Sequence, residues 1–365
     1  CAVLFYCHFP DKLLTRDNHN GGGGNGVFRG WYRSVLNGIE ERTMQYADLI
    51  AVNSNFTKRE VRLAFPNLKL ASENNANNNE IDDGVEMKVL YPAIDLTKFI
   101  PPNNDQTTTS SNSNTATMGP IVSLNRFERK KNISLLLHAY SLLLQRSSNA
   151  STIIPKLVIA GGYDHNNNEN ISYLSELRHL SLTLNLTTSN QYESDAQIIF
   201  LPNISESQKS TLLKSALCVC YTPDREHFGI VPLEAMYAGA PIICVNSGGP
   251  METVIHDTTG FLVENTPMGF ADKIYLLMND CKKRVWMGKN GHDHVKRMFG
   301  WEMFEHDWMC LIEECADRGN KRYNITRNRV VRVGYVSILY DLALAFIMAI
   351  SLTWFLRRIG VLDMD

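Results

Sequence analysis

The sequence predicts an α/β protein of two domains, each built on a parallel β-sheet. Three observations support this class. The chain has 365 residues, more than one hydrophobic core usually serves. Short apolar segments alternate with helical segments along the chain, and their strands are apolar without polar alternation, which indicates sheets covered on both faces. A polar, low-complexity tract at residues 101–117 separates two sets of these segments.

These observations place the first domain at residues 1–100, a low-complexity linker at 101–117 and the second domain at 118–295. The chain does not begin with Met and opens directly on a strand-like segment, so we expect it to lack the first part of its N-terminal domain. Its 36 basic and 38 acidic side chains nearly balance. The net charge therefore indicates no polyanionic partner, and we expect no binding to nucleic acid.

In the first domain, residues 1–7 predict a buried strand that ends before His8. Apolar residues at helical spacing follow at 28–47, and an apolar strand at 48–54 leads into a polar cap for the next helix. A histidine just beyond the carboxyl end of a buried strand lies where α/β folds place ligand contacts. His8 is therefore a candidate site residue, and the alternative is a histidine that simply ends the strand.

The second domain is predicted from four buried strands near 120–124, 157–162, 198–202 and 216–220, with helices between them. The first of these strands runs into a basic loop that contains Arg126, Arg129, Lys130 and Lys131. We expect this positive charge to face the cleft at a turn between strand and helix. Toward the C-terminal end, residues 269–299 and then 301–315 are predicted to be helical.

The chain is organised around residues 221–252, where a strand leads into a helix whose first turn holds Gly229 and Pro232. The free amides and the dipole at this helix start favour phosphate. Glu226 lies before the helix and Glu234 lies within it, so two carboxylates border a site for anions. A nucleotide sugar fits both the carboxylates and the anion site, because its hydroxyls donate to acceptors while its diphosphate binds amides and cations.

A second turn follows the strand at residues 241–245. It contains Gly248 and Gly249, which would let the backbone approach a ligand closely. The segments EHFGIVPLEAM and AGAPIICVNSGGPMETV together resemble the motifs of the retaining GT-B glycosyltransferases (glycosyltransferase family 4). The segment HFPDKLL is similar to one in the dolichol-pathway α-1,3/1,6-mannosyltransferases. The resemblance implies two Rossmann-like domains around a cleft, the first of them incomplete here, and a helix at 296–320 that crosses back to the first domain.

The resemblance also implies roles for individual residues. Arg126 and Lys131 correspond to the pair that grips the donor diphosphate, with Lys130 as the alternative to Lys131. Metal-independent catalysis without a cofactor is expected. The implied catalytic residues are His8, Glu226, Arg126 and Lys131; the donor-binding residues are Arg126, Lys131, Glu226, Phe228, Gly229, Ile230, Glu234, Gly248 and Gly249; the acceptor side consists of His8, Asp11 and Lys12.

The reaction that the resemblance implies is transfer of mannose from GDP-mannose to a dolichyl-diphosphate-linked oligosaccharide, with α-1,3 and α-1,6 linkages, in N-glycan precursor synthesis. Two alternatives remain open. One is another lipid-linked GT-B enzyme that transfers α-1,2-mannose or N-acetylglucosamine. The other is a subunit that binds a sugar nucleotide without catalysis. The expected partners are the donor, the lipid-linked acceptor, the membrane and other enzymes of the same pathway.

Residues 333–358 contain an apolar stretch long enough to cross a bilayer. Basic residues are more numerous before this stretch than after it, which predicts that the globular part faces the cytosol. We therefore expect the endoplasmic reticulum membrane, with the catalytic domain on the cytosolic side. An interfacial helix or a buried hairpin is the competing interpretation.

Overall fold

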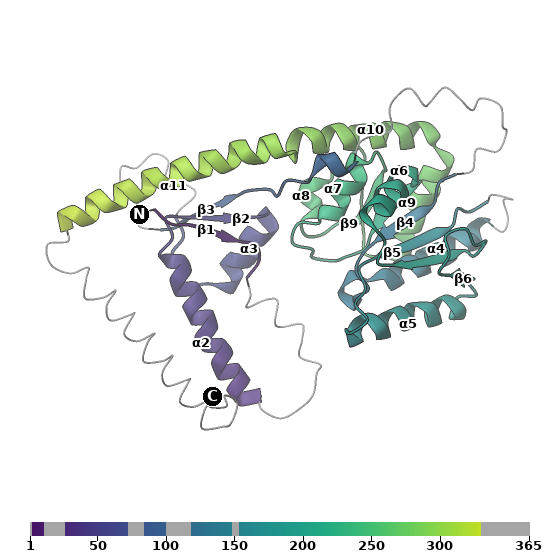
Figure 1. Ribbon diagram of the computed structural model, residues 1–365, viewed down its shortest axis with the longest axis horizontal. Helices are drawn as coiled ribbons and strands as arrows, with labels where there is room; N and C mark the ends of the chain where they lie inside the picture. The colour runs from purple at the N-terminus through teal and green to yellow at the C-terminus, as the bar shows by residue number, and fades with distance from the viewer. Residues whose placement is uncertain (1, 11–25, 72–83, 100–117, 148–152, 330–365) are drawn as a thin grey trace.

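The protein is described here by a computed structural model, which covers residues 2–10, 26–71, 84–99, 118–147 and 153–329. These residues form two parallel sheets with helices around them, which confirms the predicted α/β class (Figure 1). The first sheet has the strand order β1-β2-β3 and the second has the order β10-β9-β8-β4-β5-β7-β6. The strands are β1 (Leu4–Cys7), β2 (Leu49–Val52), β3 (Glu86–Val89), β4 (Ile121–Leu124), β5 (Leu157–Gly161), β6 (Thr188–Ser189), β7 (Ile198–Pro202), β8 (Cys218–Tyr221), β9 (Ile242–Val245) and β10 (Gly260–Val263).

Both faces of the second sheet are covered because its central strands carry apolar side chains on each side. In β4, Ile121 packs into one core and Val122 into the other, and both are fully buried. One face is covered by α4 (Ile133–Ser147), α5 (Asn168–Thr183) and α9 (Pro267–Asn279); the other is covered by α6 (Glu206–Ser215), α7 (Ile230–Tyr237) and part of α10 (Cys281–Met298).

The strand order of the second sheet creates a topological switch point at its centre, which we call the crevice. The neighbours β4 and β8 pair in parallel, but the chain leaves β4 toward β5 and leaves β8 toward β9, on opposite sides. In open α/β sheets such a switch point is where ligands bind, beyond the carboxyl ends of the strands. The loops that follow β4 and β8 therefore meet at this crevice.

The central strand of the first sheet, β2, is buried between helices of its own domain and a helix from the C-terminal part of the chain. In β1 only Cys7 is buried, contrary to the buried strand predicted at 1–7, because β1 lies at the edge of the sheet. Helices α2 (Gly26–Gln45) and α3 (Asn55–Ala64) contribute Met44 and Val61 to the core on one face. On the other face, Leu311 and Cys315 of α11 (Trp301–Arg329) pack against Leu49 of β2. Figure 1 shows α11 running from the end of α10 across the first sheet, so one helix joins both halves of the molecule.

Two helical boundaries differ from the prediction. The single helical stretch at 269–299 is interrupted at Asp280, whose backbone leaves the helical region and whose carboxylate caps α10 by accepting from the Lys283 amide at 2.8 Å. The crossover helix extends beyond residue 320 to Arg329. Contacts with the first domain favour the extension, since Arg322 Nη2 lies 3.1 Å from the carboxylate of Asp48.

Among the described residues, no helix has the length and apolarity needed to cross a membrane. The predicted membrane segment at 333–358 lies outside the described residues, as does the predicted linker at 101–117.

Candidate active site

The loop between β8 and α7 forms one wall of the crevice. It contains Glu226, and it turns into α7 at Gly229, whose φ of 83° lies in the left-handed region that favours glycine. Pro232 lies in the first turn of α7, where the absence of its amide hydrogen costs nothing. The backbone amides at the start of the helix therefore follow Glu226 closely in the chain.

The loop after β9 is packed directly against this wall. A Cβ atom on Gly248 would lie 2.4 Å from the carbonyl oxygen of Glu226, and a Cβ on Gly249 would lie 2.3 Å from the backbone of Phe228. The Gly249 amide donates to the Glu226 carbonyl at 2.7 Å. The close approach that the glycine pair permits is thus made with the backbone of the Glu226 loop, and the two loops form one unit.

Lys131 enters the site from the loop after β4 and pairs with Glu226. Its Nζ lies 2.5 Å from Glu226 Oε2, and only 10% of the Lys131 side chain is exposed. Thr222 supports the pair by donating its hydroxyl to the Lys131 carbonyl at 2.6 Å. Burial opposes ionisation of Glu226, but the adjacent Lys131 outweighs it and lowers the pKa of Glu226. Glu226 is therefore ionised and neutralised by a lysine from a distant part of the chain.

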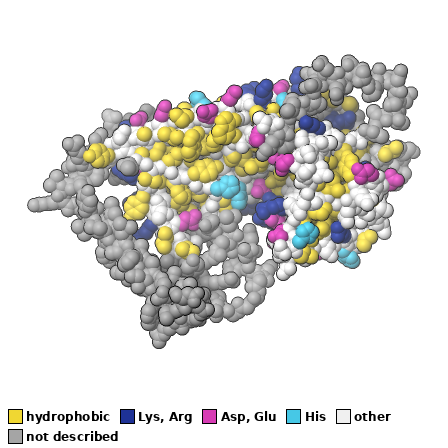
Figure 2. Space-filling view, viewed as in Figure 1, with side chains coloured by type: hydrophobic (Ala, Val, Ile, Leu, Met, Phe, Trp, Pro, Cys, Tyr) yellow, Lys and Arg dark blue, Asp and Glu magenta, His cyan; other side chains and the backbone are white. Residues whose placement is uncertain are grey.

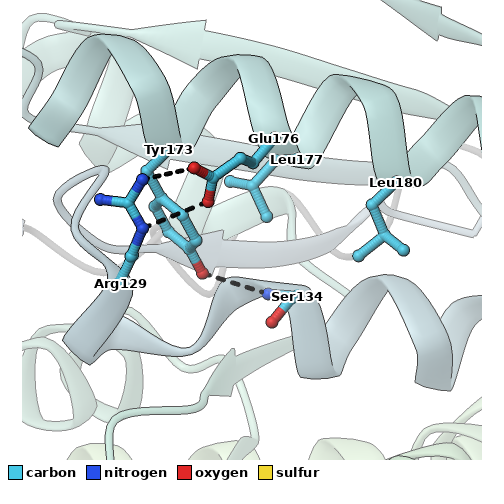
Figure 3. Close-up of a pocket in the computed structure, with 6 residues that line it drawn as sticks. All are labelled: Arg129, Ser134, Tyr173, Glu176, Leu177 and Leu180. Carbon is cyan, nitrogen blue, oxygen red and sulfur yellow. Dashed lines mark hydrogen bonds and ion pairs between the residues drawn. The ribbon is translucent and has the colours of Figure 1, made fainter.

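The other basic side chains of this loop take different directions. Arg126 is 60% exposed and pairs with Glu128 at 2.9 Å, and Lys130 pairs with the same carboxylate at 3.2 Å. Arg129 does not face the crevice, contrary to the prediction. Its guanidinium pairs with Glu176 at a pocket of about 340 Å³ between α4 and α5 (Figure 3).

Glu234 lies on α7 beside a lysine that the sequence did not single out. Its Oε1 is 3.0 Å from Nζ of Lys209 on α6, and Lys209 also pairs with Glu206 at 2.8 Å. Burial acts against the charge of Lys209, yet its hydrogen bonds to the two glutamates raise its pKa. The sequence predicted helices between the strands of this domain, but a single lysine in a polar helix carries no signal of its partner.

His8 faces this wall from the first domain. Its Nδ1 lies 3.3 Å from the side-chain nitrogen of Asn53, which follows β2. Its ring centroid is 6.4 Å from that of His227, in an edge-to-face arrangement, and Phe9 stacks on His227 at 3.5 Å. His8 is thus brought to the Glu226 loop, whereas Asp11 and Lys12 lie outside the described residues.

His227 was also missed by the sequence analysis, although it stands beside Glu226 in the motif. Burial, opposed by Glu226 and assisted by His8, lowers the pKa of His227 to about 4. The imidazole is therefore neutral at pH 7 and stacks as an uncharged aromatic ring.

The predicted donor-site residues divide into two groups by environment. Phe228 is buried against Tyr91 and Phe299, so of this residue only the backbone is suited to bind a ligand, while Ile230 is half exposed. Figure 2 shows charged and histidine side chains gathered where the two halves of the molecule meet. In the described ranges no group of three or more His, Cys, Asp or Glu side chains could hold a metal ion.

Comparison with known proteins identifies the family. The family model for glycosyl transferases group 1 matches residues 107–294. The α-1,3/1,6-mannosyltransferase ALG2 of Dictyostelium discoideum is 35% identical over 324 residues, which cover 86% of this chain and 70% of the relative. The human ALG2 is 37% identical over 305 residues, which cover 83% of this chain and 65% of the relative.

The chain belongs to the group 1 glycosyltransferases. The predicted family and enzyme class are therefore confirmed, and the similarity extends to the α-1,3/1,6-mannosyltransferases that the sequence analysis named.

Solved structures show that this glycosyltransferase has the GT-B fold. Sucrose-phosphate synthase from Thermosynechococcus elongatus superposes with a TM-score of 0.61 at 20% identity, covering 85% of this chain and 67% of that one. Anabaena Alr3699/HepE in complex with UDP and glucose superposes with a TM-score of 0.60 at 17% identity, covering 86% and 71%. At these identities the likeness concerns the fold.

Proposed function

We propose that this glycosyltransferase transfers mannose from GDP-mannose to a dolichyl-diphosphate-linked oligosaccharide, forming α-1,3 and α-1,6 linkages with retention of configuration. The observation that carries the proposal is the identity of 35% and 37% to two α-1,3/1,6-mannosyltransferases. The site agrees with it, because a buried cation–carboxylate pair, a helix start and a histidine from the opposite domain surround one crevice.

Lys131 and Glu226 can serve the donor while they remain paired. A lysine ammonium has three N–H donors, so it can hold Glu226 and a phosphate oxygen together. As the bond between the mannose C1 and the phosphate oxygen breaks, negative charge grows on the departing GDP. Lys131 and Arg126 stabilise this charge together with the amides of Phe228, Gly229 and Ile230. We propose that these groups act without a metal ion, as the family resemblance implies.

The two glutamates accept hydrogen bonds from hydroxyl groups of the sugar nucleotide. Glu226 accepts from mannose hydroxyls, and Glu234 accepts from the ribose while it stays bound to Lys209, since a carboxylate has about four acceptor positions. The acceptor hydroxyl attacks C1 from the face that GDP leaves, and the departing phosphate oxygen takes its proton. This sequence breaks one glycosidic bond, forms another and requires no nucleophilic side chain.

We propose that His8 orients the mannose and the acceptor from the first domain, with Asp11 and Lys12 on the acceptor side. We also propose, on the sequence alone, that residues 333–358 anchor the enzyme at the cytosolic face of the endoplasmic reticulum membrane. A soluble sugar nucleotide and a lipid-anchored acceptor can meet there, and anchoring raises the effective concentration of the acceptor.

The test is to incubate the full-length protein in membranes with GDP-mannose, UDP-glucose or UDP-N-acetylglucosamine and defined lipid-linked acceptors. The proposal expects transfer from GDP-mannose alone, to give products with α-1,3 and α-1,6 bonds. Transfer of N-acetylglucosamine, or formation of an α-1,2 bond, would support the other lipid-linked enzyme class. Binding of GDP without transfer by the intact protein would support the non-catalytic subunit.

A further inference from the structure

A carboxylate from the second domain binds the start of a helix in the first. Glu252 lies on α8 (Pro250–Thr253), one turn beyond the glycine loop. Its Oε2 accepts from the backbone amide of Asn55 at 2.7 Å, and its Oε1 accepts from that of Phe56 at 2.7 Å. The side-chain amide of Asn55 and the hydroxyl of Tyr91 also donate to Oε2, each at a distance of 3.0 Å. Glu252 thereby caps α3 from across the domain boundary.

This contact satisfies groups that a helix start leaves unpaired. The first amides of a helix have no partner within it, and the positive end of its dipole favours an anion. In α3, Ser54 caps the helix by accepting from the Thr57 amide at 3.0 Å, and Glu252 takes the amides of Asn55 and Phe56. The helix start is therefore completed by a residue of the other domain.

The residues just before α3 contact the active site. The hydroxyl of Ser54 donates to the carbonyl of His227 at 2.6 Å, next to Glu226 in the chain. The side chain of Asn53 holds His8 at 3.3 Å. Three consecutive residues, from 53 to 55, thus connect His8, the Glu226 loop and Glu252.

On the donor side, Glu252 is tied to the loops that the sugar nucleotide would touch. The Glu252 amide donates to the Gly249 carbonyl at 2.9 Å, and Gly249 in turn donates to the Glu226 carbonyl at 2.7 Å. Two backbone hydrogen bonds therefore connect the Glu226 loop to Glu252.

We propose that Glu252 is a positioning residue of this enzyme: its carboxylate caps α3, holds the two domains closed and so sets His8 against the Glu226 loop. The proposal rests on the function proposed above, in which His8 and Glu226 act on the same sugar. In the described part of the chain, every hydrogen bond that the structure assigns to the Glu252 side chain comes from the first domain. Its task is therefore to join the domains.

Substitution of Tyr91 offers a second way to test the same contact, because its hydroxyl donates to Glu252. Burial, with the neighbouring Glu252, raises the pKa of Tyr91 to about 12, so its hydroxyl donates over the whole working range of pH. Loss of this hydroxyl removes one donor, while the backbone amides of Asn55 and Phe56 still donate to Glu252. A Tyr91→Phe variant should therefore weaken the contact less than Glu252→Gln does.

The experiment compares full-length Glu252→Gln with the wild type in steady-state kinetics, GDP binding by calorimetry and small-angle X-ray scattering. Hydrogen bonds to a charged group are strong, so losing the charge should lower kcat about tenfold or more. The Kd for GDP should change less than about twofold, because the phosphate and ribose contacts remain. The radius of gyration should increase as the domains separate.

Two further variants make the test specific. Asp257→Asn is the matched control, because this carboxylate pairs at 2.7 Å with Lys283 of its own domain, and it should behave as the wild type does. The kcat of the double variant Glu252→Gln/Tyr91→Phe should be no lower than that of Glu252→Gln alone, since both substitutions act on one contact.

A Glu252→Gln variant with the kcat and radius of gyration of the wild type would overturn the proposal. So would a double variant whose loss of kcat equals the combined losses of the two single variants. If Glu252→Gln does not fold, Tyr91→Phe and Asn55→Ala carry the same comparison, because each removes one side-chain donor to Glu252, and unchanged kcat in both would overturn it. A wild-type protein that transfers no mannose contradicts the proposed function instead. The scattering comparison requires no turnover, so the two failures are distinguishable.

Discussion

In the function proposed above, the buried charge pair of Lys131 and Glu226 prepares the donor site before the donor arrives. A carboxylate that is largely removed from water is costly unless a cation neutralises it, and Lys131 provides that cation at 2.5 Å. The same lysine retains donors for a phosphate. In the proposed function the pair therefore links the stability of the crevice to binding of the diphosphate.

Replacing Lys131 by Met should affect stability as well as turnover. It leaves the Glu226 side chain, 23% exposed, without its cation, which should lower the free energy of unfolding by about 2–3 kcal/mol. Turnover should fall more than donor affinity, because charge on the diphosphate grows in the transition state. Thermal unfolding and steady-state kinetics measure the two effects.

Arg126→Ala is the matched control for that prediction, since Arg126 is 60% exposed and its loss should reduce turnover with little change in stability. Adding Glu226→Gln to Lys131→Met should restore most of the lost stability and none of the turnover. Equal destabilisation by Lys131→Met and Arg126→Ala would contradict the buried-pair interpretation.

His227 makes the stability of the junction depend on pH. Its pKa is about 4 in the folded protein and near 6.5 when unfolded, so the unfolded chain binds more protons between these values. Stability should therefore be highest above pH 6.5 and fall as the pH decreases toward 4. Because His227 is partly exposed, we expect the free energy of unfolding to be lower at pH 5 than at pH 7 by about 1 kcal/mol.

A His227→Phe variant preserves an aromatic ring against Phe9 and removes the titration. Its melting temperature should therefore change less than that of the wild type between pH 7 and pH 5. Burial also lowers the pKa of His294, so some dependence should persist in the variant. Identical pH profiles of the two proteins would refute the assignment to His227.

At the scale of elements, α7 has a glycine with a left-handed backbone conformation at each end. Gly229 precedes the helix with a φ of 83°, and Gly239 follows it with a φ of 84°. A Cβ on Gly239 would meet nothing within 4 Å, and one on Gly229 would meet only ordinary contacts, the nearest at 3.4 Å. Substitution at either position therefore costs mainly backbone strain.

Gly229→Ala and Gly239→Ala should thus destabilise the protein by a similar amount, about 1–2 kcal/mol each. Only Gly229→Ala should also weaken GDP binding, because it displaces the amides at the start of α7 that we assign to the diphosphate. Calorimetry with GDP and thermal unfolding separate the two effects. An equal loss of GDP affinity in both variants would place the phosphate elsewhere.

At the scale of the whole molecule, α11 joins the two domains by covering the first sheet. Leu311 is buried against β2, whereas its neighbour Ile312 on the same helix is 40% exposed. Leu311→Ala should lower the free energy of unfolding of the first domain by about 2–4 kcal/mol, through lost burial and a cavity. Ile312→Ala should cost less than about 0.5 kcal/mol.

Limited proteolysis and thermal unfolding measure this difference, and the GDP affinity should be the same in both variants because the donor residues lie in the other domain. If Leu311→Ala weakened GDP binding as much as it destabilised the first domain, α11 would have to act on the donor side.

Much of the fold follows from local pattern. Apolar runs identified the strands around residues 49–52, 121–124, 157–161, 198–202 and 218–221, and the polar cap after residue 52 identified the start of α3. Gly229 and Pro232 identified the start of α7. These features depend on interactions within about ten residues, so the order of amino acids alone determines them.

The motif around Glu226 and Glu234 also identified the family, through its resemblance to the motifs of known glycosyltransferases. The amides, glycines and carboxylates themselves indicated only a nucleotide sugar. It did not reveal how the side chains are used. Arg129 and Lys131 stand two positions apart in one basic run, yet a short helical turn directs the first to α5 and the second to Glu226.

What only the tertiary structure decided is which distant residues meet. Lys131 reaches Glu226 because β4 and β8 are neighbours in the sheet, and Lys209 reaches Glu234 because α6 and α7 cover the same face. Glu252 reaches α3 because α11 and the junction hold two domains together. Such contacts depend on strand order and domain docking, which arise from burial across the whole chain, and no local pattern of residues encodes them.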